Sequence, residues 1–139
     1  MKTIRKNILK ILISLIVITA GVSCLNMKNS EYYVTFTGRV EIVHVIIPDT
    51  AVNMSNTNIQ ANSQASDGCW RNLNFLLNKT SDFEYTLEAF GLYESSGTCP
   101  PGMVYGDTSI VFQPKAPGLY KFYVTKSQYV TEIDTMIVK

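Results

Sequence analysis

Apolar and polar residues alternate along several stretches of the chain, most regularly in segment 83–89. Successive side chains of a β-strand point to opposite faces, so this alternation predicts a strand with one buried face. The turn signal Pro117-Gly118 predicts the start of another strand. The residues of that strand expected to face inward are Tyr120, Phe122 and Val124.

The same patterning predicts five further strands, at 39–47, 59–63, 70–77, 108–113 and 130–138. Seven strands separated by turn signals, with no helical period after the N-terminus, predict an all-β, two-sheet sandwich. Segment 39–47 is apolar on both faces, which leaves its inward face open. A strand that kinks and changes sheets would account for that pattern.

The N-terminus has the pattern of an export signal. Four basic residues precede the apolar run 11–20, and small residues follow it just before Cys24. The run is shorter and more polar than a membrane span of about 20 residues requires. The segment resembles a bacterial lipoprotein signal, which implies lipidation of Cys24, although Gly21 and Val22 depart from the usual residues. Ordinary cleavage nearby is the alternative.

Three cysteines in an exported chain leave one thiol over unless it has another role. Lipidation would account for Cys24, and Cys69 can then pair with Cys99 in an oxidising compartment. We therefore expect a signal peptide at 1–23, a lipidated cysteine and short tether at 24–38, and one domain at 39–139.

Removal of the signal changes the charge of the chain. The signal holds four of the twelve basic residues and none of the eleven acidic ones, so eight basic residues remain and the net charge becomes −3. An acidic domain without a basic cluster argues against nucleic acid as a partner.

The motif Gly118-x-Tyr120-x-Phe122 resembles the tyrosine corner of immunoglobulin-like domains. This resemblance implies an immunoglobulin-like sandwich in which strands 70–77, 117–124 and 130–138 share a sheet. The expected disulfide would link loops at one end instead of the two sheets. Together with Cys69-Trp70, Cys99-Pro100 and the signal, the motif is similar to small uncharacterised bacterial lipoproteins with such a domain, a likeness that implies no activity.

Candidate catalytic and metal-binding groups are few. His44 is the single histidine, so a zinc site built on several histidines is excluded. Glu84 and Glu88 are separated by about 13 Å along a strand, too far for paired carboxylates in glycoside hydrolysis. Three aspartates near turns, Asp49, Asp67 and Asp107, lack the spacing of a calcium loop. We expect no enzyme activity and no cofactor.

Aromatic residues are the remaining candidates for ligand or partner contact. Alternation predicts that Trp70 and Tyr123 point outward on one sheet face, among amide and carboxylate side chains. Alternatively, Trp70 packs beneath the loop that holds Cys99. Tyr93 and Tyr105 flank that loop, and the same two interpretations apply to them: contact with a ligand or partner, or packing against the loop.

These observations predict a lipid-anchored binding or accessory module of the bacterial cell envelope, non-enzymatic and in contact with another protein. The alternative is a carbohydrate-binding module that uses an aromatic strand face. The expected location is the cell envelope, with the membrane bound through lipid at Cys24.

Overall fold

The structure is a computed structural model that describes residues 32–139. The expected signal peptide and the lipidation of Cys24 lie outside these residues. Within residues 32–139, no helix is long and apolar enough to cross a membrane.

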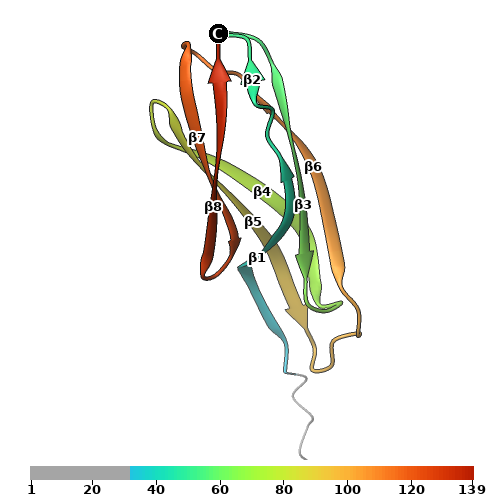
Figure 1. The fold of residues 1–139 in the computed structure, drawn as a ribbon. Coiled ribbons are helices and arrows are strands. Elements are labelled where there is room, and N and C mark those ends of the chain that lie inside the picture. Colours follow the sequence, from blue (N-terminus) through green and yellow to red (C-terminus); the bar gives the residue numbers. More distant parts are fainter. Residues whose placement is uncertain (1–31) are drawn as a thin grey trace, which may run out of the picture. The chain divides into compact units, whose positions relative to one another are not determined.

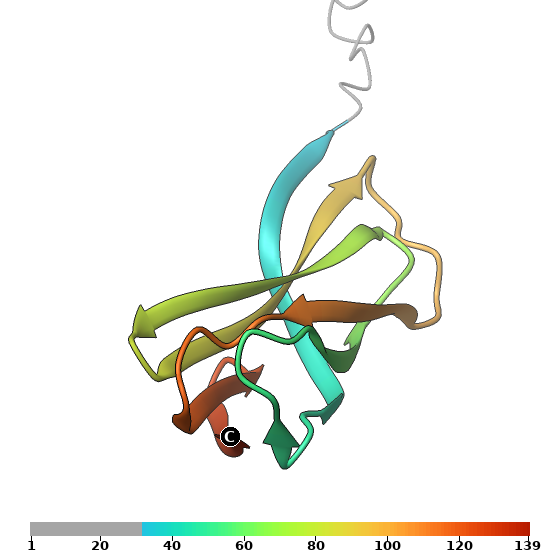
Figure 2. The same cartoon turned by 90° about the horizontal axis from the view of Figure 1, so that it is seen from above.

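The described residues form an all-β domain, which confirms the expected class (Figure 1). The strands are β1 (Val34–Ile46), β2 (Thr50–Ala51), β3 (Thr57–Ala65), β4 (Trp70–Ser81), β5 (Glu84–Ser95), β6 (Val104–Phe112), β7 (Gly118–Ser127) and β8 (Val130–Val138). They join in the order β2-β8-β7-β5-β1-β3-β6, and β4 pairs with β5. The connected sheet curls into a half-barrel (Figure 2).

The curl depends on β1, which changes its partner along its length. Residues Val34–Val40 pair with β5, and Glu41–Ile46 pair with β3. A bulge at Val43 adds one residue to β1 and shifts its alternation by one position. Val40 and Ile42 are therefore buried before the bulge and Ile47 after it. The prediction for this segment was a strand that kinks and changes sheets; the structure shows a bulged strand that changes its partner from β5 to β3 within one connected sheet. The bulge explains why both of its faces read as apolar.

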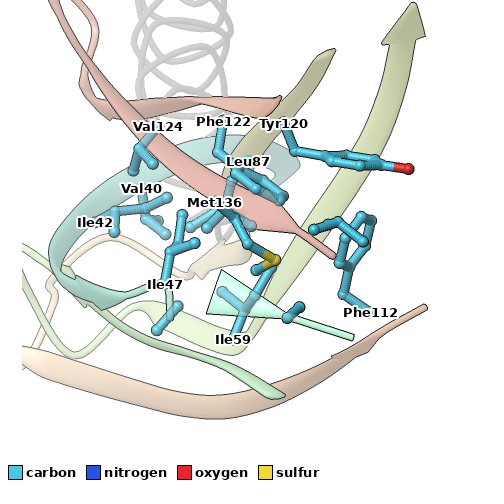
Figure 3. Packing of buried hydrophobic residues seen from close by; sticks show 14 of the residues in the cluster. Val40, Ile42, Ile47, Ile59, Leu87, Phe112, Tyr120, Phe122, Val124 and Met136 are labelled. Carbon is cyan, nitrogen blue, oxygen red and sulfur yellow. The ribbon is translucent and has the colours of Figure 1, made fainter. Parts of the chain in front are cut away.

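The core fills the inside of the curl (Figure 3). The predicted inward residues of β7, Tyr120, Phe122 and Val124, are at most 1% exposed. The hydroxyl of Tyr120 donates a 2.9 Å hydrogen bond to the carbonyl oxygen of Ala116, which satisfies a buried polar group four residues upstream. Ile59 of β3 and Phe112 of β6 are buried in the same core.

Strands β4, β7 and β8 belong to one connected sheet, as expected, but β4 is not a direct neighbour of β7. β5 lies between β4 and β7 and pairs in parallel with β7, through Glu84–Leu87 and Lys121–Val124. Alternation indicates which face of a strand is buried, but it carries no information about which strand lies alongside. The position of β5 separates Trp70 on β4 from Tyr123 on β7.

Candidate binding groove

Trp70 belongs to an aromatic cluster at the end of β4. Its ring meets Phe36 of β1 edge to face at 5.8 Å between centroids, and Tyr93 of β5 at 5.3 Å. Phe36 and Tyr93 are cross-strand partners and stack at 4.9 Å. Such aromatic pairs add stabilisation beyond the area they bury. Three strands thus contribute one ring each to a single cluster, which we call the aromatic cluster.

Trp70 packs against the core, so the prediction that it points outward is wrong. The cause is a bulge between Arg71 and Asn74, where β4 has one residue more than its partner β5. Asn72 sits in this bulge with a φ of +51°, a conformation that asparagine adopts more readily than most residues. The extra residue places Trp70 on the same side as Leu73.

The indole of Trp70 also contacts the neighbouring strands β1 and β5. The indole lies over the glycines of the β1–β5 ladder, and a Cβ atom on Gly38 would lie only 2.9 Å from its Cη2 atom. The loop that holds Cys99 packs on Gly68, where an added Cβ would lie 2.9 Å from the Cβ of Pro100, and its Met103 lines a pocket together with Trp70.

A groove of about 670 Å³ runs past the aromatic cluster, within the 300–1,000 Å³ typical of ligand pockets. Phe36 and Trp70 supply its aromatic surface. Arg39 and Glu88 form an ion pair on its rim, with 2.6 Å between Nη2 of Arg39 and Oε1 of Glu88, and the Glu88 side chain is only 15% exposed. The remaining lining residues are Gly38, Val40, Glu41, Ala89, Thr125, Ser127 and Gln128. The groove thus combines flat apolar rings with fixed charges and with hydroxyl and amide groups.

A smaller pocket of about 280 Å³ adjoins this groove and also uses Trp70. It shares Arg39, Val40 and Glu41 with the larger one and extends toward Gln64 and Met103. The side chain of Gln64 donates a 2.7 Å hydrogen bond to Glu41, which fixes one polar wall. Trp70 therefore contributes to two adjoining hollows.

The Cys69–Cys99 disulfide is present, as predicted, and joins the start of β4 to the β5–β6 loop. The hydroxyl of Tyr93 donates to Cys99 Sγ at 3.1 Å, so the aromatic cluster and the bridge are in contact. Cys69 directly precedes Trp70, and its carbonyl accepts a 2.9 Å bond from the amide of Glu94. The bridge therefore supports the strand end that holds the tryptophan.

Ligand atoms of Asp67, Cys69 and Cys99 lie within 4.8 Å of one another. Metals bind cysteine as thiolate, and both sulfurs are bonded to each other. The Asp67 carboxylate instead accepts a 3.0 Å bond from the amide of Cys69. The group is therefore a disulfide beside a turn carboxylate, and it offers no thiolate to a metal.

The other aromatic candidates lie apart from the groove. Tyr123 alternates with buried Phe122 and Val124 and faces away from the core, where its hydroxyl donates to Glu84 at 3.3 Å. Tyr105 is 67% exposed on β6. Of the four predicted contact residues, the structure brings together only Trp70 and Tyr93.

Titration shifts occur at the far end of β4, away from the groove. A hydrogen bond from Lys79 lowers the pKa of the exposed Asp82 carboxyl, and the same bond raises the pKa of Lys79. Burial raises the pKa of the Tyr85 hydroxyl. Lys79, Asp82 and Tyr85 line a shallow hollow of about 230 Å³.

Phe36, Arg39 and Glu88 are groove residues that sequence reasoning missed. Phe36 had been expected in the tether, whereas β1 already begins at Val34. The signal that could have identified it is its place in the apolar alternation before Gly38, but only the β1–β5 register brings it to Tyr93.

Comparisons of the chain with protein-family models, with curated proteins and with solved structures found no match.

Proposed function

We propose that this chain is a lipid-anchored, extracytoplasmic binding module of the bacterial cell envelope that contacts another protein and carries out no catalysis. The observation that carries the proposal is the groove beside Phe36 and Trp70. Its volume, aromatic surface and charged rim support this proposal, because in a recognition site rings supply contact area and charges supply direction.

An extended segment of a partner protein suits this groove. In the described part of the chain, Val34–Val40 pair with β5 along one edge, and no strand pairs with their other edge. A free strand edge offers main-chain donors and acceptors to an incoming peptide, and neighbouring pockets take its side chains. Phe36, Gly38 and Val40 belong both to this edge and to the groove.

Site-specific photo-crosslinking in intact cells tests the proposal. A photoreactive phenylalanine analogue at Phe36, which is 48% exposed, should yield one defined crosslinked protein. The matched control is the same analogue at Leu119, which is similarly exposed but lies outside the groove. Equal products from both positions, or none from Phe36, would contradict the proposal.

A carbohydrate ligand is the second candidate, because Phe36 and Trp70 lie in the groove with hydroxyl, amide and carboxylate groups around them. Sugar rings stack on aromatic faces while their hydroxyls bond to such groups. In this version the aromatic surface is the pair Phe36 and Trp70, since Tyr123 does not line the groove. A glycan array distinguishes the two candidates: binding that disappears in Trp70→Ala favours the sugar, and an array without binding removes it.

The location is part of the proposal. The signal-like pattern before Cys24 supports export and lipidation, and the Cys69–Cys99 disulfide is of a kind that persists in oxidising compartments. Intact-mass analysis of the mature chain should find acyl groups on Cys24 and lose them in Cys24→Ser. Acyl mass that persists in Cys24→Ser would refute this anchor.

We further infer that the curled sheet is a variant of the immunoglobulin-like sandwich, as in the small bacterial lipoproteins that the motifs resemble. The Tyr120 hydroxyl bond to Ala116 supports this, because a tyrosine corner bonds back to the upstream backbone in the same way. The parallel pairing of β5 with β7 is a departure from that family.

A further inference from the structure

The smaller pocket beside Trp70 lies where the ladder between β1 and β3 ends. Glu41 and Gln64 are the outermost pair of that ladder, and both line the pocket. In the strand order, β5 and β3 lie on either side of β1, so the free edge of Val34–Val40 is the one that β3 occupies further along. A segment that pairs with this free edge would run past Phe36 in the groove and end at the smaller pocket.

The smaller pocket holds a carboxylate that has no cation beside it. The Glu41 carboxylate accepts the 2.7 Å bond from Gln64, and within residues 32–139 no basic side chain forms an ion pair with it. Arg39 also lines the pocket, but its guanidinium is paired with Glu88. The groove and the smaller pocket together are lined by one basic residue and two acidic ones, so their lining is acidic.

The indole of Trp70 lines the same pocket as Glu41. A cation is attracted to the face of an aromatic ring, and tryptophan is the strongest of the aromatic residues in this contact. Val40 and Met103 add apolar wall. Lysine and arginine have an apolar stem and a charged end, so their side chains complement a pocket of this composition.

We propose that the partner segment places a lysine or arginine side chain in the smaller pocket, with its charge between the Glu41 carboxylate and the Trp70 ring. This inference rests on the proposed function, because it names a residue of the same partner. The charge of residues 32–139 supports it: seven basic and ten acidic residues give a net charge of −3. Complementary charge speeds the encounter with a basic segment and disfavours an acidic one.

Photo-crosslinking of the full chain in intact cells tests the charge of the pocket. The photoreactive phenylalanine analogue at Phe36 is used alone and together with Glu41→Gln. Glu41 is exposed, and glutamine keeps its size and can still accept the bond from Gln64, so the change removes the charge and leaves the fold intact. We expect the yield of crosslinked partner to fall about fivefold or more.

Glu84→Gln is the matched control, because Glu84 also accepts a side-chain hydrogen bond, from Tyr123, but lines neither the groove nor the smaller pocket. This variant makes the same chemical change and should leave the yield at the parental level.

Mass analysis of the crosslinked peptide locates the basic residue. Phe36 and Glu41 lie five positions apart on β1, so the lysine or arginine of an extended partner segment should lie about four to six positions from the crosslinked residue. Replacing it with glutamine should lower the yield as Glu41→Gln does. Combining the two changes should lower the yield little further, because both remove the same interaction.

The outcomes separate this inference from the proposed function. Equal products from Phe36 and Leu119, or none from Phe36, would overturn both. A defined partner from Phe36 whose yield is unchanged by Glu41→Gln, or falls equally with Glu84→Gln, would overturn the basic side chain alone. A crosslinked segment without lysine or arginine at the expected positions would do the same.

Discussion

Gly38 and Gly91 are cross-strand partners in the β1–β5 ladder, and both lie against the indole of Trp70. A side chain at either position would occupy space that the ring fills. The indole ring of Trp70 therefore packs directly on the backbone of these two glycines. The shape of the groove depends on the absence of a side chain at both positions.

Gly91→Ala should lower the free energy of unfolding by about 1–3 kcal/mol, the usual cost of overpacking a core. The added Cβ would lie 2.6 Å from Cδ2 of Leu73 and 3.0 Å from Cε3 of Trp70. Urea unfolding measures the loss, and fluorescence reports the ring directly because Trp70 is the single tryptophan. The exposed neighbour variant Thr37→Ala should leave the emission spectrum unchanged. An unchanged spectrum in Gly91→Ala as well would contradict this packing.

The bulge at Asn72 predicts a strong residue preference. Asn72→Val should cost about 1–3 kcal/mol, because a β-branched residue is strained at positive φ, whereas Asn72→Gly should be tolerated. The comparison variant is Asn78→Val, an exposed site in the regular part of the same ladder, where valine should be neutral or favourable. Thermal unfolding of the three variants ranks them, and equal effects at positions 72 and 78 would argue against the bulge.

The disulfide closes a loop with a sequence separation of 30. Replacing both Cys69 and Cys99 by alanine should lower stability by about 3–4 kcal/mol, because the unfolded chain regains the freedom that the bridge removes. Urea unfolding of the oxidised parent and the double variant measures the difference. Alkylation before and after reduction, followed by mass analysis, checks that the bridge is formed. A difference below about 1 kcal/mol with the bridge present in the parent would contradict this estimate.

Tyr85 predicts a loss of stability at alkaline pH. Burial raises its pKa, and its ring stacks on Phe122 at 5.7 Å between centroids. A group whose pKa is raised in the folded state contributes stability that is complete below the unfolded value, about 10, and is lost as the pH rises through the folded value. The free energy of unfolding should therefore fall as the pH rises above about 10, and fall less in Tyr85→Phe. Tyr129→Phe, at a residue 88% exposed, should behave like the parent.

Several features of the fold could be predicted because they depend on local pattern. Alternation predicted the inward residues Tyr120, Phe122 and Val124, and cysteine counting predicted the Cys69–Cys99 bridge. The pairing of β5 with β7 could not be predicted, because patterning identifies buried faces and not neighbouring strands. The half-barrel follows from the change of partner along β1, which is a long-range choice.

The candidate site was only partly predictable. Trp70 was recognised as a candidate, but the sheet face predicted for its side chain was wrong. The single extra residue at the Asn72 bulge exchanges the inward and outward positions of the residues that precede it in β4. Nothing local distinguishes Asn72 as bulged, since asparagine is common in turns and edges alike. Phe36 and Glu88 are brought to the groove by the register of β1 against β5, which depends on residues more than 40 positions apart.

The central claim is that the groove beside Trp70 holds the partner. The most direct measurement compares partner recovery from native membranes for Trp70→Leu and for Tyr123→Leu, with both variants first shown to be folded. Trp70→Leu removes the ring from the groove, whereas Tyr123→Leu changes an aromatic residue that does not line the groove. We predict that recovery falls about tenfold or more for Trp70→Leu, as for truncation of an aromatic hot spot, and stays at the parental level for Tyr123→Leu. Recovery that persists in Trp70→Leu and is lost in Tyr123→Leu would contradict the account.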